Sequence, residues 1–181
     1  MADLNLVVVF YSRTGLTESL ALRAAVGGVQ SRANIRLRRL PDSASEDTIA
    51  AAPAWRENRD RMNREFIAPR PADIEWADVF VLGTPAGFAA SSAEWRAYFD
   101  LLEAVESSGK LAGKVGCAFT PVPANHAALQ SLYAEMSRLG LITVPAPAVA
   151  TAEDACALAR RAAAIARAVK PVPVSWPVPA S

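Results

Sequence analysis

Short apolar segments that alternate with helix-like segments constrain the fold of this chain most strongly. The segments with strand character are Leu4–Tyr11, Asn34–Leu40, Asp78–Gly83, Val115–Thr120 and Leu141–Pro145. Most of the gaps between them carry helical patterns, at Leu16–Val29, Ser92–Ser107, Ala124–Leu139 and Ala152–Val169. Alternation of this kind predicts an α/β fold, a doubly wound parallel sheet with helices on both faces.

The polarity of the strand candidates indicates their order in the sheet. The first, third and fourth are almost continuously apolar, as expected for parallel strands covered on both faces. The second alternates, with Ile35 and Leu37 set between Arg36 and Arg38, which is typical of an edge strand. We therefore expect the order 2-1-3-4-5, in which the loops after the strands meet at one ligand-binding edge.

The loop after the first strand candidate has the composition of an anion site. It reads Ser12-Arg13-Thr14-Gly15-Leu16-Thr17 and runs directly into a helical segment. Backbone N–H groups and hydroxyls meet there at the positive end of the helix dipole, so a phosphate monoester is the expected ligand. The glycine spacing fits neither a Walker A nor a Rossmann motif, and the P-loop lysine is missing. A simple Ser/Thr-capped turn is the alternative, but three hydroxyls and a glycine exceed what one cap needs.

This loop resembles the flavodoxin signature, in which an apolar strand and an aromatic precede S-x-x-G-x-T and an alanine. Ala24 departs from the last apolar position of that signature. The matching residues are Phe10, Ser12, Gly15, Thr17 and Ala21. The resemblance implies the flavodoxin-like form of the five-stranded parallel sheet, with FMN as the cofactor. It assigns the phosphate end of FMN to Ser12, Arg13, Thr14, Gly15, Leu16 and Thr17. Arg13 either contacts the phosphate or points to solvent.

The segment after the third strand candidate indicates which flavodoxin-like proteins this chain resembles most. A strand ending in G-T-P, then x-x-F and S-x-x-x-R-x-F-x-D, is similar to WrbA-type NAD(P)H:quinone oxidoreductases and related NADPH-dependent FMN reductases. The matching residues are Gly83, Thr84, Pro85, Phe88, Ser92, Arg96 and Asp100, with Tyr98 as the aromatic. The resemblance places the isoalloxazine ring beside Thr84, Pro85, Ala86, Gly87 and Phe88. Phe88 either offers a flat face to a ligand or packs into the core.

The loop after the fourth strand candidate departs from that family. Family members carry a glycine-rich S-T-G-T-G-G-G there, whereas this chain reads Thr120-Pro121-Val122-Pro123-Ala124-Asn125-His126. Two prolines remove two N–H donors, Ala90 replaces a family asparagine, and Arg138-Leu139 replaces family histidines. At about 1 kcal/mol for each lost hydrogen bond, FMN affinity falls about a hundredfold. The resemblance still assigns Thr120, Pro121 and Val122 to the pyrimidine end. His126, the only histidine, contacts the flavin or substrate, or lies exposed at a helix start.

Composition limits the other functions. The chain has 181 residues, 52% of them hydrophobic, and a formal net charge of +1, so we expect one globular domain without affinity for nucleic acid. No apolar run approaches the roughly 18 residues of a membrane span, and no signal peptide is evident, which predicts a cytoplasmic protein. Cys117 and Cys156 have the surroundings of core residues, and no cluster suggests a metal site.

Two regions stand outside this scheme. We assign residues 1–170 to a flavodoxin-like domain with a long insertion at 41–74, and residues 171–181 to a proline-rich tail. The insertion contains a charged helical segment, Trp55–Glu65, which is either a surface helix held by Trp55 or a lid over the site. Four arginines near the second strand either bind an NADP phosphate or protect an edge, and we favour the edge. They are Arg32, Arg36, Arg38 and Arg39.

The leading functional prediction is an FMN-dependent oxidoreductase that passes electrons from NAD(P)H to a quinone or a similar acceptor. The cofactor performs the chemistry in such enzymes, so no catalytic side chain is assigned. A flavodoxin-like electron carrier is one alternative, although a near-neutral charge gives it little electrostatic steering. A flavodoxin-fold protein with a weakened or lost FMN site, acting through association, is the other. The resemblance also implies a homo-oligomer, a dimer or a tetramer.

Overall fold

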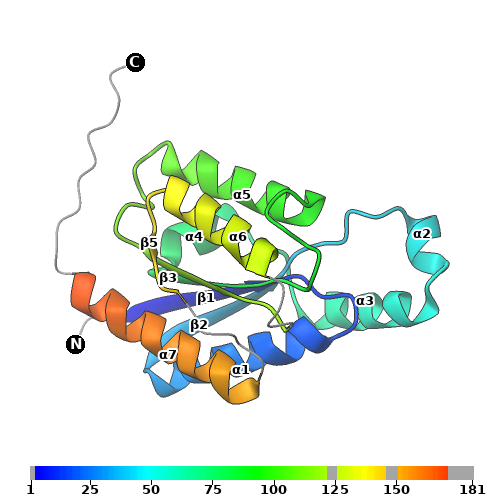
Figure 1. Cartoon of the computed structure of the whole chain (residues 1–181), viewed down its shortest axis with the longest axis horizontal. Helices are drawn as coiled ribbons and strands as arrows, with labels where there is room; N and C mark the ends of the chain where they lie inside the picture. The colour runs from blue at the N-terminus through cyan, green and yellow to red at the C-terminus, as the bar shows by residue number, and fades with distance from the viewer. Residues whose placement is uncertain (1–2, 122–125, 146–150, 171–181) are drawn as a thin grey trace.

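Figure 1 shows the computed structural model of the chain, a twisted sheet between two layers of helices. The structure describes residues 3–121, 126–145 and 151–170, apart from the side chain of His126. The proline-rich tail 171–181 and Val122 lie outside the described residues.

The sheet has the predicted order. Its five strands are parallel and run β2-β1-β3-β4-β5. Their bounds are β1 Leu4–Phe10, β2 Ala33–Arg39, β3 Val79–Gly83, β4 Val115–Phe119 and β5 Ile142–Thr143. The register sets Phe10 beside Gly83 and Gly83 beside Phe119, so the three central strands end level with one another. The loops that follow them therefore start at one edge of the sheet.

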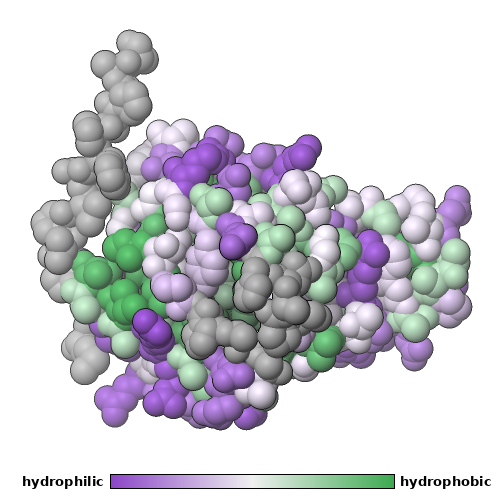
Figure 2. Space-filling model, viewed as in Figure 1, coloured by the Kyte–Doolittle hydropathy of each residue, from purple (hydrophilic) through white to green (hydrophobic). Residues whose placement is uncertain are grey.

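The fifth strand is shorter than Leu141–Pro145, the predicted range. Among the described residues, only Ile142 and Thr143 pair with β4, and Val144 adds one further hydrogen bond from its N–H to the carbonyl of Gly116, at 2.8 Å. Pro145 has no N–H to continue the ladder. In Figure 2 the deepest green of this face lies over the region of β5, at the left of the view.

Helices cover both faces of the sheet, as predicted. On one face lie α1, Leu16–Gln30, and α7, Ala152–Val169; on the other lie α4, Pro71–Trp76, α5, Ala93–Glu106, and α6, His126–Arg138. The contact between α1 and α7 is very close at Gly27, where an added Cβ would lie 2.3 Å from the backbone oxygen of Cys156. Cys156 and Cys117 are both buried, as expected.

The insertion forms an arm at one end of the molecule (Figure 1). It contains α2, Glu46–Ala50, and α3, Pro53–Glu65, and the chain then returns through α4 to β3. Helix α3 begins two residues before the predicted Trp55, because a proline suits the first turn of a helix. Sequence patterns missed α2 and α4, which are only 5 and 6 residues long. Near the end of the arm, the carbonyl of Ile67 accepts a hydrogen bond from Arg39 N, at 3.2 Å, so the returning chain covers part of the β2 edge.

The arginines of the edge strand have internal partners. Arg36 and Arg38 both pair with Asp73 of α4, at 3.1 and 2.6 Å. Burial tends to raise the pKa of the Asp73 carboxyl, but its hydrogen bonds, with that from Arg38 the strongest, hold the pKa below the ordinary value. These pairs agree with the favoured edge role of the arginines.

Candidate functional site

The loop between β1 and α1 forms a polar cradle at the start of the helix. Ser12 and Thr17 are both 1% exposed, and Ser12 Oγ accepts a hydrogen bond of 3.0 Å from Gly15 N. Gly15 precedes α1 with φ +87°, a left-handed conformation that favours glycine. Thr14 and Leu16 are exposed at the rim. Among the residues that the structure describes, no side chain caps the start of α1, so the amides of its first turn are available to an anion.

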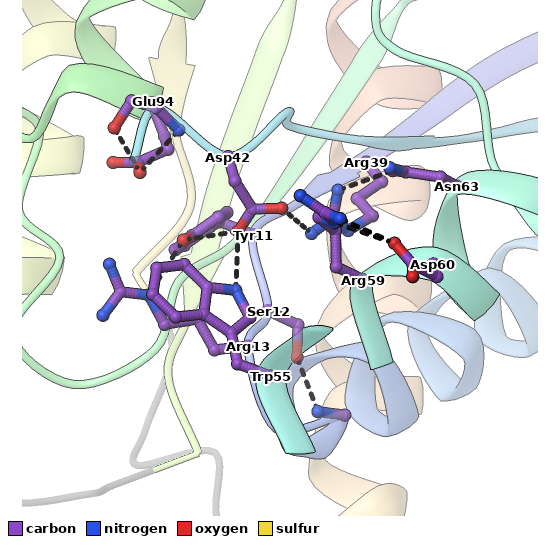
Figure 3. A network of polar contacts seen from close by, with 12 residues as sticks. Tyr11, Ser12, Arg13, Arg39, Asp42, Trp55, Arg59, Asp60, Asn63 and Glu94 are labelled. Atoms are coloured by element: carbon purple, nitrogen blue, oxygen red, sulfur yellow. Dashed lines mark hydrogen bonds and ion pairs between the residues drawn. The ribbon is translucent and has the colours of Figure 1, made fainter. Parts of the chain in front are cut away.

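Arg13 takes a position that neither sequence alternative described. Its Cζ lies 3.8 Å from the ring centroid of Trp55 in α3 and 4.7 Å from that of Phe88. Its Nε donates a hydrogen bond of 3.0 Å to the hydroxyl of Tyr11. The guanidinium therefore fills a gap between two aromatic rings, a cation–π arrangement. Figure 3 shows the indole of Trp55 lying over Arg13.

Asp42, which sequence reasoning missed, joins the insertion to the site. Its Oδ1 accepts hydrogen bonds of 2.9 Å from the hydroxyl of Tyr11 and from Nε1 of Trp55, and its Oδ2 pairs with Arg39 at 2.5 Å (Figure 3). Burial raises the pKa of Tyr11 above its ordinary value, so the hydroxyl stays protonated and donates. In the sequence, Asp42 follows a proline and reads as a turn residue, and that pattern gives no sign of these partners.

The loop after β3 is held by Thr84, which is fully buried. Its hydroxyl accepts a hydrogen bond of 2.9 Å from Nε1 of Trp95 and donates one of 2.6 Å to the carbonyl of Phe88. The ring of Phe88 is half-buried and packs on Tyr11, with centroids 4.8 Å apart. One part of the Phe88 ring therefore packs against Tyr11 and another part stays exposed at the edge of the sheet. Phe88 thus combines the two expected roles, a core residue and a residue that can contact a ligand.

The rest of this loop is open to solvent. Ala86 and Gly87 are exposed, and Pro85 is half-buried. Gly87 has φ +84°, and an added Cβ would meet nothing within 4 Å. The backbone of this loop is therefore accessible to a ligand at the edge of the sheet.

The loop after β4 starts beside the loop after β3, since Thr84 N donates a hydrogen bond of 3.0 Å to the carbonyl of Phe119. Thr120 is 1% exposed, and its Oγ1 has no hydrogen-bond partner among the residues that the structure describes. Pro121 is half-buried at the same edge. A buried hydroxyl without a partner is costly, and a bound ligand would remove that cost.

The described part of the three loops thus lies at one edge of the sheet, as predicted. Two residues that the sequence analysis assigned to the cofactor site are not fully described. Val122 lies outside the described residues, and of His126 only the backbone, which begins α6, is described. Within the described ranges, no three His, Cys, Asp or Glu residues cluster in a way that suits a metal ion. No helix in those ranges has both the length and the apolar character needed to cross a membrane.

Comparison with known proteins identifies the family. The sequence profile of the NADPH-dependent FMN reductase family matches residues 7–155. The chain belongs to this family. The match spans β1 to the start of α7 and includes all three loops.

Two curated relatives carry the name NAD(P)H dehydrogenase (quinone). The protein from Deinococcus radiodurans is 34% identical over 148 residues, which cover 80% of this chain and 74% of that protein. The protein from Archaeoglobus fulgidus is 27% identical over 147 residues, covering 79% of this chain and 76% of its own length. The predicted resemblance to quinone-linked members of the family is confirmed.

Solved structures confirm the flavodoxin-like fold. The WrbA-like flavodoxin protein of Agrobacterium tumefaciens superposes with a TM-score of 0.63 and 24% identity, over 92% of this chain and 99% of that one. The flavodoxin of Megasphaera elsdenii gives 0.60 and 17% identity, over 88% and 98%.

The residues at the sheet edge fit the groups of FMN. The amides at the start of α1 lack a side-chain cap and suit a phosphate, and the buried Thr120 hydroxyl lacks a partner among the described residues. The rings of Trp55 and Phe88 both contact the planar guanidinium of Arg13, at 3.8 and 4.7 Å from their centroids, and such aromatic faces also suit a planar flavin.

Proposed function

We propose that this protein is an FMN-dependent oxidoreductase that passes electrons from NAD(P)H to a quinone or a similar acceptor. The proposal rests on one combined observation, the family match over residues 7–155 together with an uncapped helix start at a hydroxyl-rich loop. The names of the curated relatives support a quinone as the acceptor.

Each loop has a proposed task. Ser12, Thr14, Gly15 and Thr17 bind the phosphate through hydroxyls and backbone amides, with Arg13 and Leu16 at the border of that site. The loop of Thr84, Pro85, Ala86, Gly87 and Phe88 lies along the ring. Thr120, Pro121, Val122 and His126 lie toward the pyrimidine end.

When bound in these loops, FMN would supply the two-electron chemistry between NAD(P)H and the acceptor. The protein binds the phosphate and orients the ring. The hydrogen bonds of Thr84 to Trp95 and Phe88 keep the ring-side loop in one conformation. No side chain is needed as a general base.

A second candidate is a flavodoxin-fold protein that has lost its cofactor and acts through association. One observation favours it, because the guanidinium of Arg13 already fills the gap between Trp55 and Phe88. A carrier role has no such support, since the net charge of +1 provides little steering.

Titration of the flavin-free protein with FMN separates the candidates. Saturable quenching of flavin fluorescence, weakened by Thr17→Ala and by Gly15→Asp, followed by NAD(P)H oxidation with a benzoquinone, is the expected result. A protein that binds no FMN at high micromolar concentration contradicts the proposal and favours the second candidate.

A homo-oligomer in the cytoplasm completes the proposal. Exposed apolar side chains on α1, those of Leu22, Val26 and Val29, support self-association. NAD(P)H is a metabolite of the cell interior, which supports the location. Sedimentation of the purified chain measures the oligomeric state, and a monomer at all concentrations contradicts that part.

A further inference from the structure

We infer that helix α3 of the insertion forms a wall of the cofactor site, with Arg61 acting at the phosphate end and Trp55 at the ring end. The inference rests on the proposed function and extends it to residues outside the three loops. It follows from two sets of contacts between α3 and the loop after β1.

The first set joins Arg61 to the start of α1. Its Nη1 and Nη2 donate hydrogen bonds of 2.8 and 2.6 Å to the two carboxylate oxygens of Glu18. The Glu18 side chain is only 7% exposed, whereas that of Arg61 is 37% exposed. An added Cβ at Gly15 would lie 3.5 Å from Oε2 of Glu18 and 3.9 Å from Nη2 of Arg61. Both charged groups are therefore next to the phosphate cradle.

The negative charge of Glu18 would repel a phosphate bound at the start of α1. A carboxylate in the first turn of a helix interacts favourably with the helix dipole, and a phosphate at the same place competes for that interaction. Two anions this close repel each other strongly where solvent is limited. The bidentate pair with Arg61 offsets the charge of the Glu18 carboxylate, and Nη1 of Arg61 also donates a hydrogen bond of 3.0 Å to Glu65. We therefore assign Arg61 a positioning and neutralising role toward the phosphate.

The second set concerns Trp55. Its indole N–H is held by Asp42 at 2.9 Å, which orients the ring, and one face of the ring covers the Arg13 guanidinium. The same guanidinium also contacts Phe88, whose ring centroid lies 4.7 Å from Arg13 Cζ. A guanidinium and a flavin are both planar, so a ring that displaces Arg13 stacks on Trp55 in its place.

The two residues are spaced to suit one ligand. Trp55 and Arg61 are six positions apart in the helix, which corresponds to about 9 Å along the axis, close to the reach of the ribityl chain that joins ring and phosphate.

Three flavins separate the two roles. FMN carries ring, ribityl chain and phosphate, riboflavin lacks the phosphate, and lumiflavin lacks the chain as well. The flavin-free, full-length protein is titrated with each by fluorescence quenching. Arg61→Gln should weaken FMN binding tenfold or more and leave riboflavin within twofold. Trp55→Leu should weaken all three about tenfold.

Matched controls keep the test specific. Arg64→Gln changes an exposed arginine three residues along the same helix, and Trp76→Leu changes a tryptophan of α4; both should bind FMN as the unchanged protein does. Adding Glu18→Gln to Arg61→Gln should restore most of the FMN affinity, because the uncompensated carboxylate is gone. If Arg61→Gln does not fold, Arg61→Lys replaces it, with an expected FMN affinity between those of the unchanged protein and a neutral variant.

The possible results show separately whether the roles of Arg61 and Trp55 are wrong and whether the proposed FMN-dependent function is wrong. A protein that binds FMN equally well with and without Arg61, or that loses riboflavin as much as FMN, overturns the inference and leaves the proposed function standing. Unchanged or tighter binding by Trp55→Leu overturns the ring-end role in the same way. An unchanged chain that binds none of the three flavins overturns both.

Discussion

Replacing Asp42 by asparagine tests the buried ion pair that joins the insertion to the sheet. The side chains of Arg39 and Asp42 are 2% and 3% exposed, and their closest nitrogen and oxygen are 2.5 Å apart. Asparagine keeps the oxygen that accepts from Tyr11 and Trp55. It also places an N–H donor opposite the guanidinium donors, so a buried positive charge loses its partner.

The expected loss follows from this geometry. Removing one partner of a buried ion pair costs about 3–5 kcal/mol. Arg39 retains a hydrogen bond of 2.9 Å to Asn63, so we expect the lower end of that range. With a denaturant slope of about 2–3 kcal/mol per molar, the urea midpoint should fall by about 1–1.5 M.

A double-mutant cycle with Arg39→Met assigns the loss to the pair. Where methionine already replaces the arginine, Asp42→Asn should cost less than about 1 kcal/mol, which makes the coupling energy about 2 kcal/mol or more. The assay is urea unfolding followed by circular dichroism. A coupling energy below about 0.5 kcal/mol would refute the reasoning, because the pair would then contribute no more than an exposed one.

Three further substitutions test the helix packing, the strand edge and the ring-side loop. Gly27→Ala puts a Cβ 2.3 Å from the backbone oxygen of Cys156, so α1 and α7 must separate, at a cost of about 1–3 kcal/mol in urea unfolding. Asp73→Asn removes a carboxylate whose folded pKa is depressed; its stabilisation is present above the unfolded pKa near 3.8 and is lost as the pH falls through the folded value. The two proteins should therefore differ in stability at pH 7, and the difference should begin to shrink only as the pH falls below about 4. Thr84→Val removes the hydroxyl bonded to a buried indole N–H and to the carbonyl of Phe88, at a cost of about 2–3 kcal/mol.

Each of these has its own check. In Gly28→Ala the added Cβ would lie 2.4 Å from Cδ1 of Ile35 and 3.4 Å from Cδ1 of Leu6. These are side-chain ends rather than backbone, so this change should cost less than Gly27→Ala, and the reverse order contradicts the packing argument. If the stabilities of the unsubstituted protein and of Asp73→Asn differ by the same amount at every pH, the depressed pKa of Asp73 does not account for the stabilisation. Thr84→Ser keeps the hydroxyl and should retain most of the stability, whereas equal losses for serine and valine point to the methyl group.

Local patterns predicted the elements whose signals are local. Helix α7 spans Ala152–Val169, the predicted bounds, and begins at a capping box between Thr151 and Asp154 that is legible in the sequence. The alternating arginines of β2 correctly indicated the edge. Helices α2 and α4 escaped prediction because each is only one or two turns long and is held by a buried residue, Ile49 or Ile74, whose partners are distant in the chain.

Strand polarity, loop composition and motif spacing are properties of neighbouring residues, so they were enough to predict the sheet order, the place of the three loops and the family. The side chains that face those loops became known only from the folded chain. Arg13 stacks on Trp55, and Asp42 accepts from that same indole. Arg61 pairs with Glu18. These partners come from an insertion that matches no motif, and burial and charge pairing bring them together only after the chain has folded.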